Sequence, residues 1–402
     1  MNPGFRLPKP EGWTKLPHGP LGLTFKNQVI NLSNLIKINI RSGLHSVGGV
    51  FMISIIIPTY NERENLEELF ERVSRALEDR DFEIIIVDDD SPDKTWEKAE
   101  ILGKIYPVRV IRRTKEKGLS SAVIRGFEEA NGDIIVVMDA DLQHPPEVIP
   151  KLIEAIEHGA DISIASRYVK GGKVENWYWW RKIISKGAIM VGRVALPKIR
   201  DIKDPVSGFF ALKREVIENV NLNPVGFKIL LEILIKGKYE KAIEIPFTFG
   251  LRRGGESKLS QKQIFNYLKH LYRLMRWEGE IDRLVKFSVV GLSGVLVNEG
   301  ALWGFVEFLS WDKRLAVLPA TELSVLNNFV WNDIWTFKDL KRKALYSRLL
   351  NFHFATLTGA LVQWAIYLVL LHVGLHYLVA NLIGIGFSFV VRFLFNRNIT
   401  WG

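Results

Sequence analysis

The segment Asp139-Ala140-Asp141-Leu142-Gln143 places two carboxylates one residue apart directly after an apolar run. That run, residues 132–138, has the composition of a strand buried on both faces of a parallel sheet. Open α/β sheets bind ligands at the carboxyl ends of their strands, and a turn there lets both carboxylates reach one hard cation, Mg²⁺ or Mn²⁺. The same residues also suit an ordinary strand end before a helix N-cap, so the rest of the chain decides between the two interpretations.

Two earlier segments follow the same pattern, in which an apolar strand ends in polar or acidic residues. Residues 53–57 lead into Pro58-Thr59-Tyr60-Asn61-Glu62, and residues 82–87 lead into Asp88-Asp89-Asp90-Ser91-Pro92-Asp93. Apolar residues at helical spacing follow each of them, and further strands are predicted at 108–111, 161–165 and 243–247. This alternation predicts a mostly parallel α/β sheet, so three acidic strand ends share one edge and are best explained as a nucleotide site.

Composition narrows the class of partner. The chain has 402 residues, enough for two or three domains, and carries 54 Lys and Arg against 44 Asp and Glu, a net charge of +10. An excess of positive charge suits nucleic acid, phospholipid head groups or phosphorylated substrates. The chain has no cysteine, which excludes disulfides, a thiol nucleophile and a thiolate metal site.

In order and spacing, residues 57–62, 87–93 and 139–143 resemble the family 2 glycosyltransferases of the GT-A fold. The resemblance implies that five residues line the nucleotide base and ribose: Pro58, Tyr60, Glu62, Asp89 and Asp90. It implies that Asp139, Asp141 and Gln143 hold the metal ion and the diphosphate. Lys117 and Arg125 lie in the segment that closes over the nucleotide in this family, although Lys117 also suits a solvated helix start.

Three further motifs resemble the dolichyl-phosphate mannose synthase group: Ser166-Arg167-Tyr168, Arg181-x-x-x-Ser185, and Asp204 in the Asp-x-x-Ser-Gly-Phe motif (204–209). In that group Arg167, Arg181 and Ser185 would bind the acceptor phosphate. Asp204 would position the sugar, or it is a turn residue before Pro205. The Gly-rich segment 252–258 matches the group's Arg-x-x-Gly-x-Ser-Lys loop, and its Arg252 and Lys258 would join Asp141 in catalysis by offsetting charge on the leaving diphosphate.

The implied reaction is an inverting transfer of mannose from GDP-mannose to dolichyl or another polyprenyl phosphate. Glucose transfer from UDP-glucose is the alternative, because no residue decides between guanine and uracil. A phosphate monoester has a second pKa of about 6 and is mostly dianionic near neutral pH, so the acceptor needs no general base.

The last third of the chain predicts a membrane domain. Residues 284–309, 349–373 and 377–396 are long and apolar enough to span a bilayer, whereas 315–337 is interrupted by polar residues. Residues 286–337 and 352–401 form an internal repeat that resembles the four-helix GtrA-like membrane domain. The loop between the two units holds five basic residues, which predicts that this loop, both termini and the catalytic domain are cytoplasmic.

The predicted organisation has four parts. Residues 1–51 would be an N-terminal extension, disordered or a misassigned start, and 52–259 a GT-A domain; 260–283 would be an amphipathic interfacial helix and 284–402 the four-helix domain. A second interfacial helix is predicted at 177–197, from its mixture of Trp, basic and apolar residues.

Three rival functions remain less well supported. A processive polysaccharide synthase would need a Gln-x-x-Arg-Trp motif, and the nearest segment, 273–277, lacks the Gln. A lipid-linked-sugar carrier or flippase with a nucleotide-binding domain would not need the complete set of donor, metal and acceptor motifs. A nucleic-acid partner is not expected, because it explains the charge but not the apolar spans.

Overall fold

A seven-stranded sheet forms the centre of the first part of the protein. The computed structural model describes residues 51–175, 178–250 and 261–402. The strand order is β3-β2-β1-β4-β7-β5-β8, and β7 runs antiparallel to its two neighbours while the other pairs are parallel. The strands are β1 (Ile53–Thr59), β2 (Phe82–Asp88), β3 (Val108–Arg112), β4 (Ile134–Val137), β5 (Ile162–Ser166), β7 (Phe210–Lys213) and β8 (Ala242–Pro246).

Helices cover both faces of this sheet because successive strand residues point to opposite sides. Ile55 and Ile57 pack with α2 (Leu66–Ala76), α3 (Thr95–Leu102) and α5 (Ile149–Glu157) on one face. Ile56 packs with α4 (Leu119–Glu129) and α7 (Ile229–Lys236) on the other. The short elements are β6 (Lys173–Val174) paired with β9 (Thr248–Phe249), and the 3₁₀ turns η1 (Pro146–Val148), η2 (Pro197–Ile199) and η3 (Arg214–Val216).

The predicted mostly parallel α/β sheet is confirmed, and β7 and α7 are among the elements that the sequence analysis did not predict. The four residues of β7 follow a polar turn, and an apolar run this short does not reveal its direction. Helix α7 has seven buried residues among its eight, so it lacks the polar face that produces a helical period.

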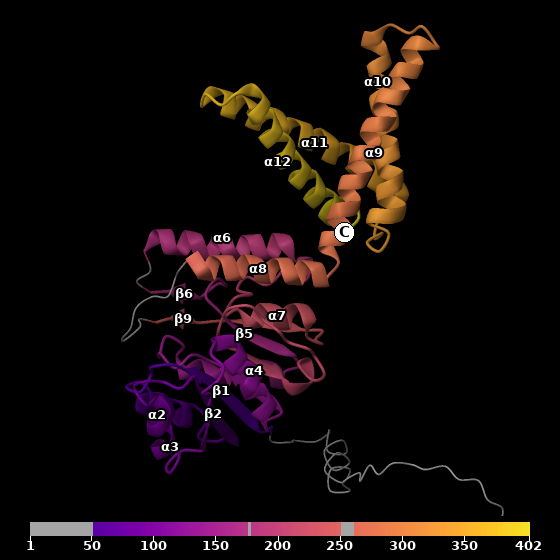
Figure 1. Ribbon diagram of the computed structural model, residues 1–402. Coiled ribbons are helices and arrows are strands. Elements are labelled where there is room, and N and C mark those ends of the chain that lie inside the picture. Colours follow the sequence, from indigo (N-terminus) through magenta and orange to yellow (C-terminus); the bar gives the residue numbers. More distant parts are fainter. Residues whose placement is uncertain (1–50, 176–177, 251–260) are drawn as a thin grey trace, which may run out of the picture. The chain divides into compact units, whose positions relative to one another are not determined.

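Helices α6 (Trp179–Ala195) and α8 (Gln261–Trp277) lie side by side next to the sheet domain (Figure 1). The Tyr267 hydroxyl on α8 donates a hydrogen bond to the Ala188 carbonyl oxygen on α6, 2.7 Å away. Gly192 permits this approach, because a Cβ there would lie 2.7 Å from the same hydroxyl. Both helices leave large apolar side chains in contact with solvent: Trp179 is 72% exposed and Phe265 is 68% exposed. This is the pattern of helices that lie in a membrane interface.

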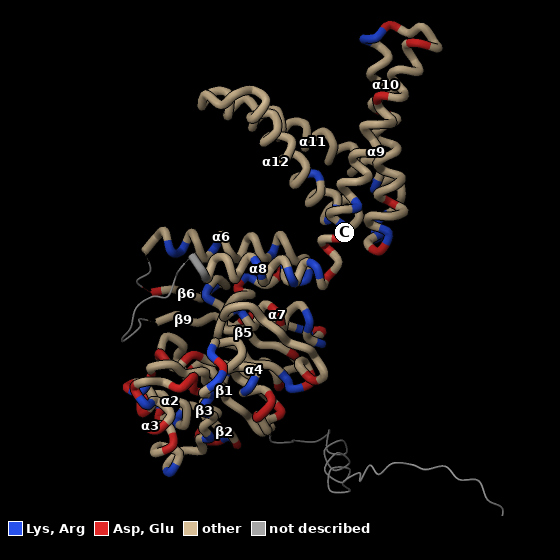
Figure 2. The backbone as a smooth tube through the Cα atoms, viewed as in Figure 1, with Lys and Arg blue, Asp and Glu red and all other residues tan. Residues whose placement is uncertain are grey.

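The repeat predicted from the sequence appears as two helical hairpins. The first is α9 (Glu280–Glu307) with α10 (Lys313–Trp331), and the second is α11 (Leu345–His372) with α12 (Tyr377–Phe395). One turn of π-helix ends each hairpin, η4 (Asn332–Thr336) and η5 (Asn396–Thr400). Figure 2 shows few charged residues along α11 and α12. Among the described residues, three helical segments are long and apolar enough to cross a membrane: Glu280–Glu307, Leu345–His372 and Tyr377–Thr400. Helix α10 is not among them, so the fourth span stays a prediction.

The two π-turns pack against each other through aromatic rings and one buried carboxylate. The rings of Phe337 and Trp401 stack with their centroids 4.6 Å apart. Asp333 accepts hydrogen bonds from Arg348 Nε at 2.7 Å and Trp401 Nε1 at 2.8 Å. Lys341 also pairs with Asp333 at 2.9 Å. Asp333 of the predicted second span therefore binds partners within the protein.

Candidate active site

One cavity of about 790 Å³ extends from the carboxyl ends of β1, β2 and β4 to helices α6 and α8. Its residues fall into three groups: polar residues at strand ends, a middle with Arg167 and Lys228, and an apolar end between the two helices. Ten of the residues expected from the sequence line it: Pro58, Tyr60, Glu62, Asp89, Lys117, Asp139, Asp141, Arg167, Arg181 and Ser185.

Asp89 is fixed in the wall by two different donors. The Arg113 guanidinium pairs with its Oδ1, and the backbone N–H of Gly118 donates to its Oδ2 at 2.7 Å. Gly118 begins α4 with a φ of 140°, a conformation that favours glycine, so this contact sets the path of the loop before α4. The preceding residue, Lys117, lies over the Tyr60 ring at 5.6 Å. The segment expected to close over the nucleotide thus faces the strand end expected to hold the base.

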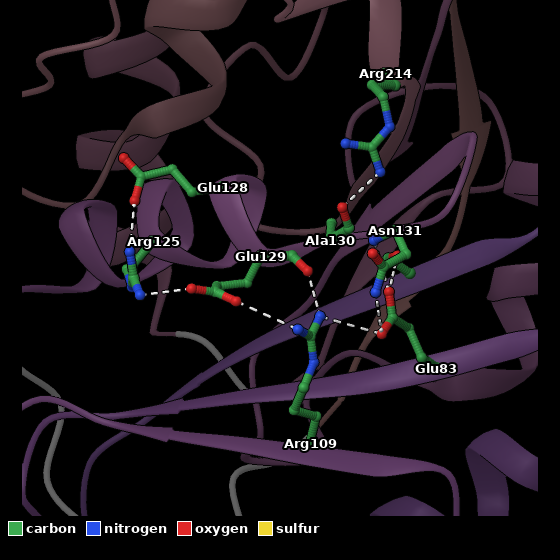
Figure 3. A network of polar contacts seen from close by, with 9 residues as sticks. Glu83, Arg109, Arg125, Glu128, Glu129, Ala130, Asn131 and Arg214 are labelled. Atoms are coloured by element: carbon green, nitrogen blue, oxygen red, sulfur yellow. Dashed lines mark hydrogen bonds and ion pairs between the residues drawn. The ribbon is translucent and has the colours of Figure 1, made fainter. Parts of the chain in front are cut away.

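Two expected nucleotide residues lie elsewhere. Asp90 is not among the cavity-lining residues, and it accepts a hydrogen bond from Arg112 Nε at 2.7 Å. Arg125 pairs with Glu128 and Glu129, which lie further along the same helix (Figure 3). Figure 3 shows this network next to Arg109 and Glu83. Glu83 lies near the amino end of its strand, so the network is at the opposite edge of the sheet from the cavity.

The turn after β4 gives the two carboxylates a common side, as the sequence predicts. Leu142 has a φ of 61°, and this left-handed residue reverses the chain directly after Asp141. The backbone N–H of Asp139 donates to His144 Nδ1 at 3.0 Å. The His144 ring is 2% exposed and stacks on Phe209 with centroids 5.2 Å apart. Burial lowers the pKa of His144 to about 4, so its ring is neutral at pH 7 and Nδ1 can accept.

Gln143 connects this turn to the base of the Gly-rich segment. Its Nε2 donates to the Gly250 carbonyl oxygen at 3.0 Å, and the Gly250 N–H donates back to the Gln143 carbonyl oxygen at 3.1 Å. Gln143 does not line the cavity, so its role as a metal ligand stays a prediction. Arg252 and Lys258, the expected catalytic cations, lie outside the described residues.

Arg167 and Asp204 form a buried bidentate ion pair. Arg167 Nε donates to Oδ2 at 2.7 Å and Nη2 donates to Oδ1 at 2.8 Å, while the backbone N–H of Arg167 adds a third bond. Asp204 is fully buried and does not line the cavity, although Arg167 does. The Asp204 carboxylate thus holds the Arg167 guanidinium in the wall, and a role of Asp204 in positioning the sugar stays a prediction.

The predicted acceptor motif lies on α6, where Arg181 and Ser185 are one turn apart. The Tyr168 hydroxyl donates to Ser185 Oγ at 2.8 Å, so the Ser-Arg-Tyr segment after β5 reaches the helix directly. Beyond these polar residues the wall becomes apolar, and its side chains come from both α6 and α8: Ile184, Ala188, Val191, Ile264 and Leu268.

Lys228 is a cavity residue that the sequence analysis missed. It precedes α7, and its Nζ donates to the Val206 carbonyl oxygen at 3.3 Å. Burial, helped by the positive charge of Arg167, lowers the pKa of Lys228 to about 7. The local sequence signal is a Lys before a mostly apolar segment, which is common and uninformative.

The donor set at the turn after β4 fits a divalent ion. Asp139 and Asp141 both line the cavity, and carboxylate oxygens are the ligands that Mg²⁺ and Mn²⁺ prefer. Within the described ranges no three His, Cys, Asp or Glu side chains gather as a complete site. Mg²⁺ is commonly held by one or two carboxylates with substrate phosphates as the remaining ligands, so two carboxylates are sufficient.

A sheet of this topology with acidic residues at its carboxyl edge is the architecture of a nucleotide-sugar transferase, and comparisons with known proteins agree. A glycosyl transferase family 2 model matches residues 54–220, and a GtrA/DPMS transmembrane domain model matches residues 286–401. The chain is 71% identical over 349 residues to a dolichol-phosphate mannosyltransferase of Pyrococcus furiosus, covering 87% of this chain and 99% of the relative. The chain belongs to the dolichol-phosphate mannosyltransferase family.

More distant relatives match a little over half of the chain. The dolichol-phosphate mannosyltransferase of Saccharomyces cerevisiae is 42% identical over 58% of this chain and 91% of its own length. The polyprenol monophosphomannose synthase of Mycolicibacterium smegmatis is 38% identical over 57% of this chain and 88% of its own length.

Proposed function

We propose that the protein transfers mannose, with inversion, from GDP-mannose to dolichyl or another polyprenyl phosphate. One observation carries the proposal: a single cavity joins the carboxylates after β4, the Arg181 and Ser185 pair on α6, and an apolar end between α6 and α8. A nucleotide sugar fits the polar end and an isoprenoid fits the apolar end. The names of the relatives support the same donor sugar and acceptor class.

The acceptor end supplies what a phosphate nucleophile needs. A phosphate dianion is already nucleophilic near neutral pH, so the protein has to hold and orient it without removing a proton. Arg181 offers a guanidinium and Ser185 a hydroxyl, and the bond from Tyr168 fixes that hydroxyl. Asp204 already fixes the Arg167 side chain, so little conformational entropy is lost when Arg167 contacts a bound phosphate.

The donor end has to offset the charge of a leaving diphosphate. A divalent ion bound by Asp139 and Asp141, with Gln143 as a further candidate ligand, would supply this stabilisation. Lys228 lies in the same cavity and adds positive charge when it is protonated. Arg252 and Lys258 are the remaining candidates from the sequence.

The membrane topology completes the proposal. Residues 52–259 form the catalytic domain, 260–283 an interfacial helix, and 284–402 a domain whose four helices all cross the bilayer. The basic loop between the hairpins, the catalytic domain and both termini lie on the cytoplasmic side. The exposed apolar side chains of α6 and α8 support a position at the membrane surface, where a polyprenyl phosphate has its head group.

A comparison of two arginines on α6 tests the acceptor assignment. Arg181 lines the cavity, whereas Arg193 does not and donates to the Arg200 carbonyl oxygen. Arg181→Ala should raise the KM for dolichyl phosphate about tenfold or more, the loss of roughly one charge-assisted hydrogen bond, and leave the KM for the donor unchanged. Arg193→Ala should leave both KM values unchanged. An equal effect of Arg181→Ala on both substrates, or none, would contradict the assignment.

A further inference from the structure

Arg392 carries a positive charge inside an apolar helix. It lies in the segment Tyr377–Thr400, which is long and apolar enough to cross a membrane. A charged side chain within a membrane-spanning segment costs free energy, and such residues usually face a protein partner or a ligand. The contacts of this arginine therefore indicate what offsets the cost.

The aliphatic part of Arg392 packs against the neighbouring helix. A Cβ on Gly359 of α11 would lie 2.3 Å from Arg392 Cγ and 2.4 Å from Cδ, so the side chain rests directly on that glycine. Its Nε is buried and has no hydrogen-bond partner. Across the part of the chain that the structure describes, none of the ion pairs involves Arg392.

The first hairpin shows that packing does not require an arginine here. There Asn328 of α10 occupies the equivalent place and rests on Gly294 of α9, whose added Cβ would meet the Asn328 amide at 2.3 Å. Asn328 Oδ1 accepts a hydrogen bond from Asn327 at 3.3 Å. The first repeat thus fills the site with a neutral, partnered amide, and the second fills it with a cation whose Nε lacks a partner.

The depth of Arg392 in the helix points to the ligand. Arg397, further along the chain, pairs with Glu280 and donates to the Val194 carbonyl oxygen on α6. With about 1.5 Å of rise per residue, the separation of Arg392 from Arg397 along the helical segment places Arg392 about 7.5 Å deeper. Helix α6 has the exposed apolar surface of a helix that lies in the membrane interface, and Arg397 contacts it. Arg392, which lies deeper than Arg397, is therefore close to the boundary between lipid head groups and hydrocarbon. The anions available there are lipid phosphates.

We infer that Arg392 and the surface around Gly359 form a binding site for a lipid-borne phosphate, separate from the cavity at Arg181. The guanidinium forms charge-assisted hydrogen bonds to phosphate oxygens, and Gly359 leaves room for the arginine beside α11. The ligand is either a polyprenyl phosphate or an anionic phospholipid, which present the same oxygens. The inference does not depend on the proposed reaction, because it concerns binding alone.

Native mass spectrometry of the full chain in detergent tests this site. The probes are dolichyl phosphate, phosphatidylglycerol and unphosphorylated dolichol, each titrated separately in the Arg181→Ala background so that the cavity site is weakened. We expect a retained adduct with at least one phosphorylated lipid and none with dolichol. Arg392→Asn, which copies the first repeat, should lower that affinity about tenfold or more, and Arg392→Lys should keep most of it.

The outcomes separate the two lipid sources and overturn the inference if it is wrong. An adduct with dolichyl phosphate alone identifies the isoprenoid as ligand, and equal adducts with phosphatidylglycerol identify bulk phospholipid. Unchanged binding of both phosphorylated lipids by Arg392→Asn would overturn the inference. Arg392→Gln provides a second neutral variant if Arg392→Asn does not fold, and unchanged binding there has the same meaning.

Discussion

His144 offers a sharp test of how the carboxylate turn is held. Its Nδ1 accepts the backbone N–H of Asp139, and its ring stacks on Phe209. His144→Phe keeps an aromatic ring in the stack and removes the acceptor. The variant therefore isolates the hydrogen bond from the packing, and His144 is a positioning residue whose effect reaches the cavity through Asp139.

The expected magnitude follows from the contact. An unpaired backbone N–H costs about 1–3 kcal/mol, and because this bond is only partly buried we expect about 1 kcal/mol, the lower end of that range. For a domain of about 200 residues this lowers the Tm by about 2–4 °C. The larger effect should be on metal use, because loss of a group that orients a metal ligand typically lowers metal affinity about 10–100-fold.

The assay is a titration of sugar transfer with Mn²⁺, alongside thermal unfolding. His144→Asn is the matched control, because its amide oxygen can replace Nδ1 as acceptor while the ring stack is lost. We expect a raised Mn²⁺ midpoint for His144→Phe and a midpoint close to that of the unaltered protein for His144→Asn. If His144→Phe leaves the midpoint unchanged, the hydrogen bond does not position Asp139 and the reasoning is refuted.

Three further predictions follow from buried charges. Asp204→Asn leaves Arg167 buried without its carboxylate and should lower the free energy of unfolding by about 3–5 kcal/mol; a Tm within about 2 °C of the unaltered protein would contradict this. Burial lowers the pKa of Lys228 from 10.5 to about 7 in the folded protein. Between pH 7 and 10.5 the unfolded chain therefore binds one more proton than the folded protein, and the free energy of unfolding rises with pH. Lys228→Met removes this contribution and should flatten the rise. An identical pH profile of the Tm in the variant would count against it. Asp141→Ala should abolish transfer while thermal unfolding and circular dichroism stay unchanged; full activity would end the metal assignment.

Most of the sheet could be predicted because its strands are long apolar runs between turn residues. The acidic ends after residues 57, 87 and 138 also predicted their common edge, since parallel strands finish on the same side. The repeat units were equally visible, because packing of the two π-turns depends on matching aromatic residues such as Phe337 and Trp401.

The contacts of the site residues could not be predicted, because they depend on how the fold places these residues and not on a local sequence pattern. Lys228 reaches the cavity from the start of a helix that has no polar face, and His144 follows the turn that it supports. The buried ion pair between Asp204 and Arg167 was not predicted either, because the two residues lie on separate segments that the fold brings together. Such pairings depend on how the strands are ordered across the sheet, and the insertion of β7 between β4 and β5 was not visible in the sequence.

The measurement that tests the central claim most directly is sugar transfer by the purified full chain in detergent. Labelled GDP-mannose or UDP-glucose is offered with dolichyl phosphate, in the presence of Mn²⁺ or of a chelator. We predict lipid-linked mannose that disappears with the chelator. Label from UDP-glucose alone would contradict the donor and keep the acceptor chemistry. The absence of a lipid product from either donor would contradict the claim that the cavity joins a nucleotide sugar to a polyprenyl phosphate.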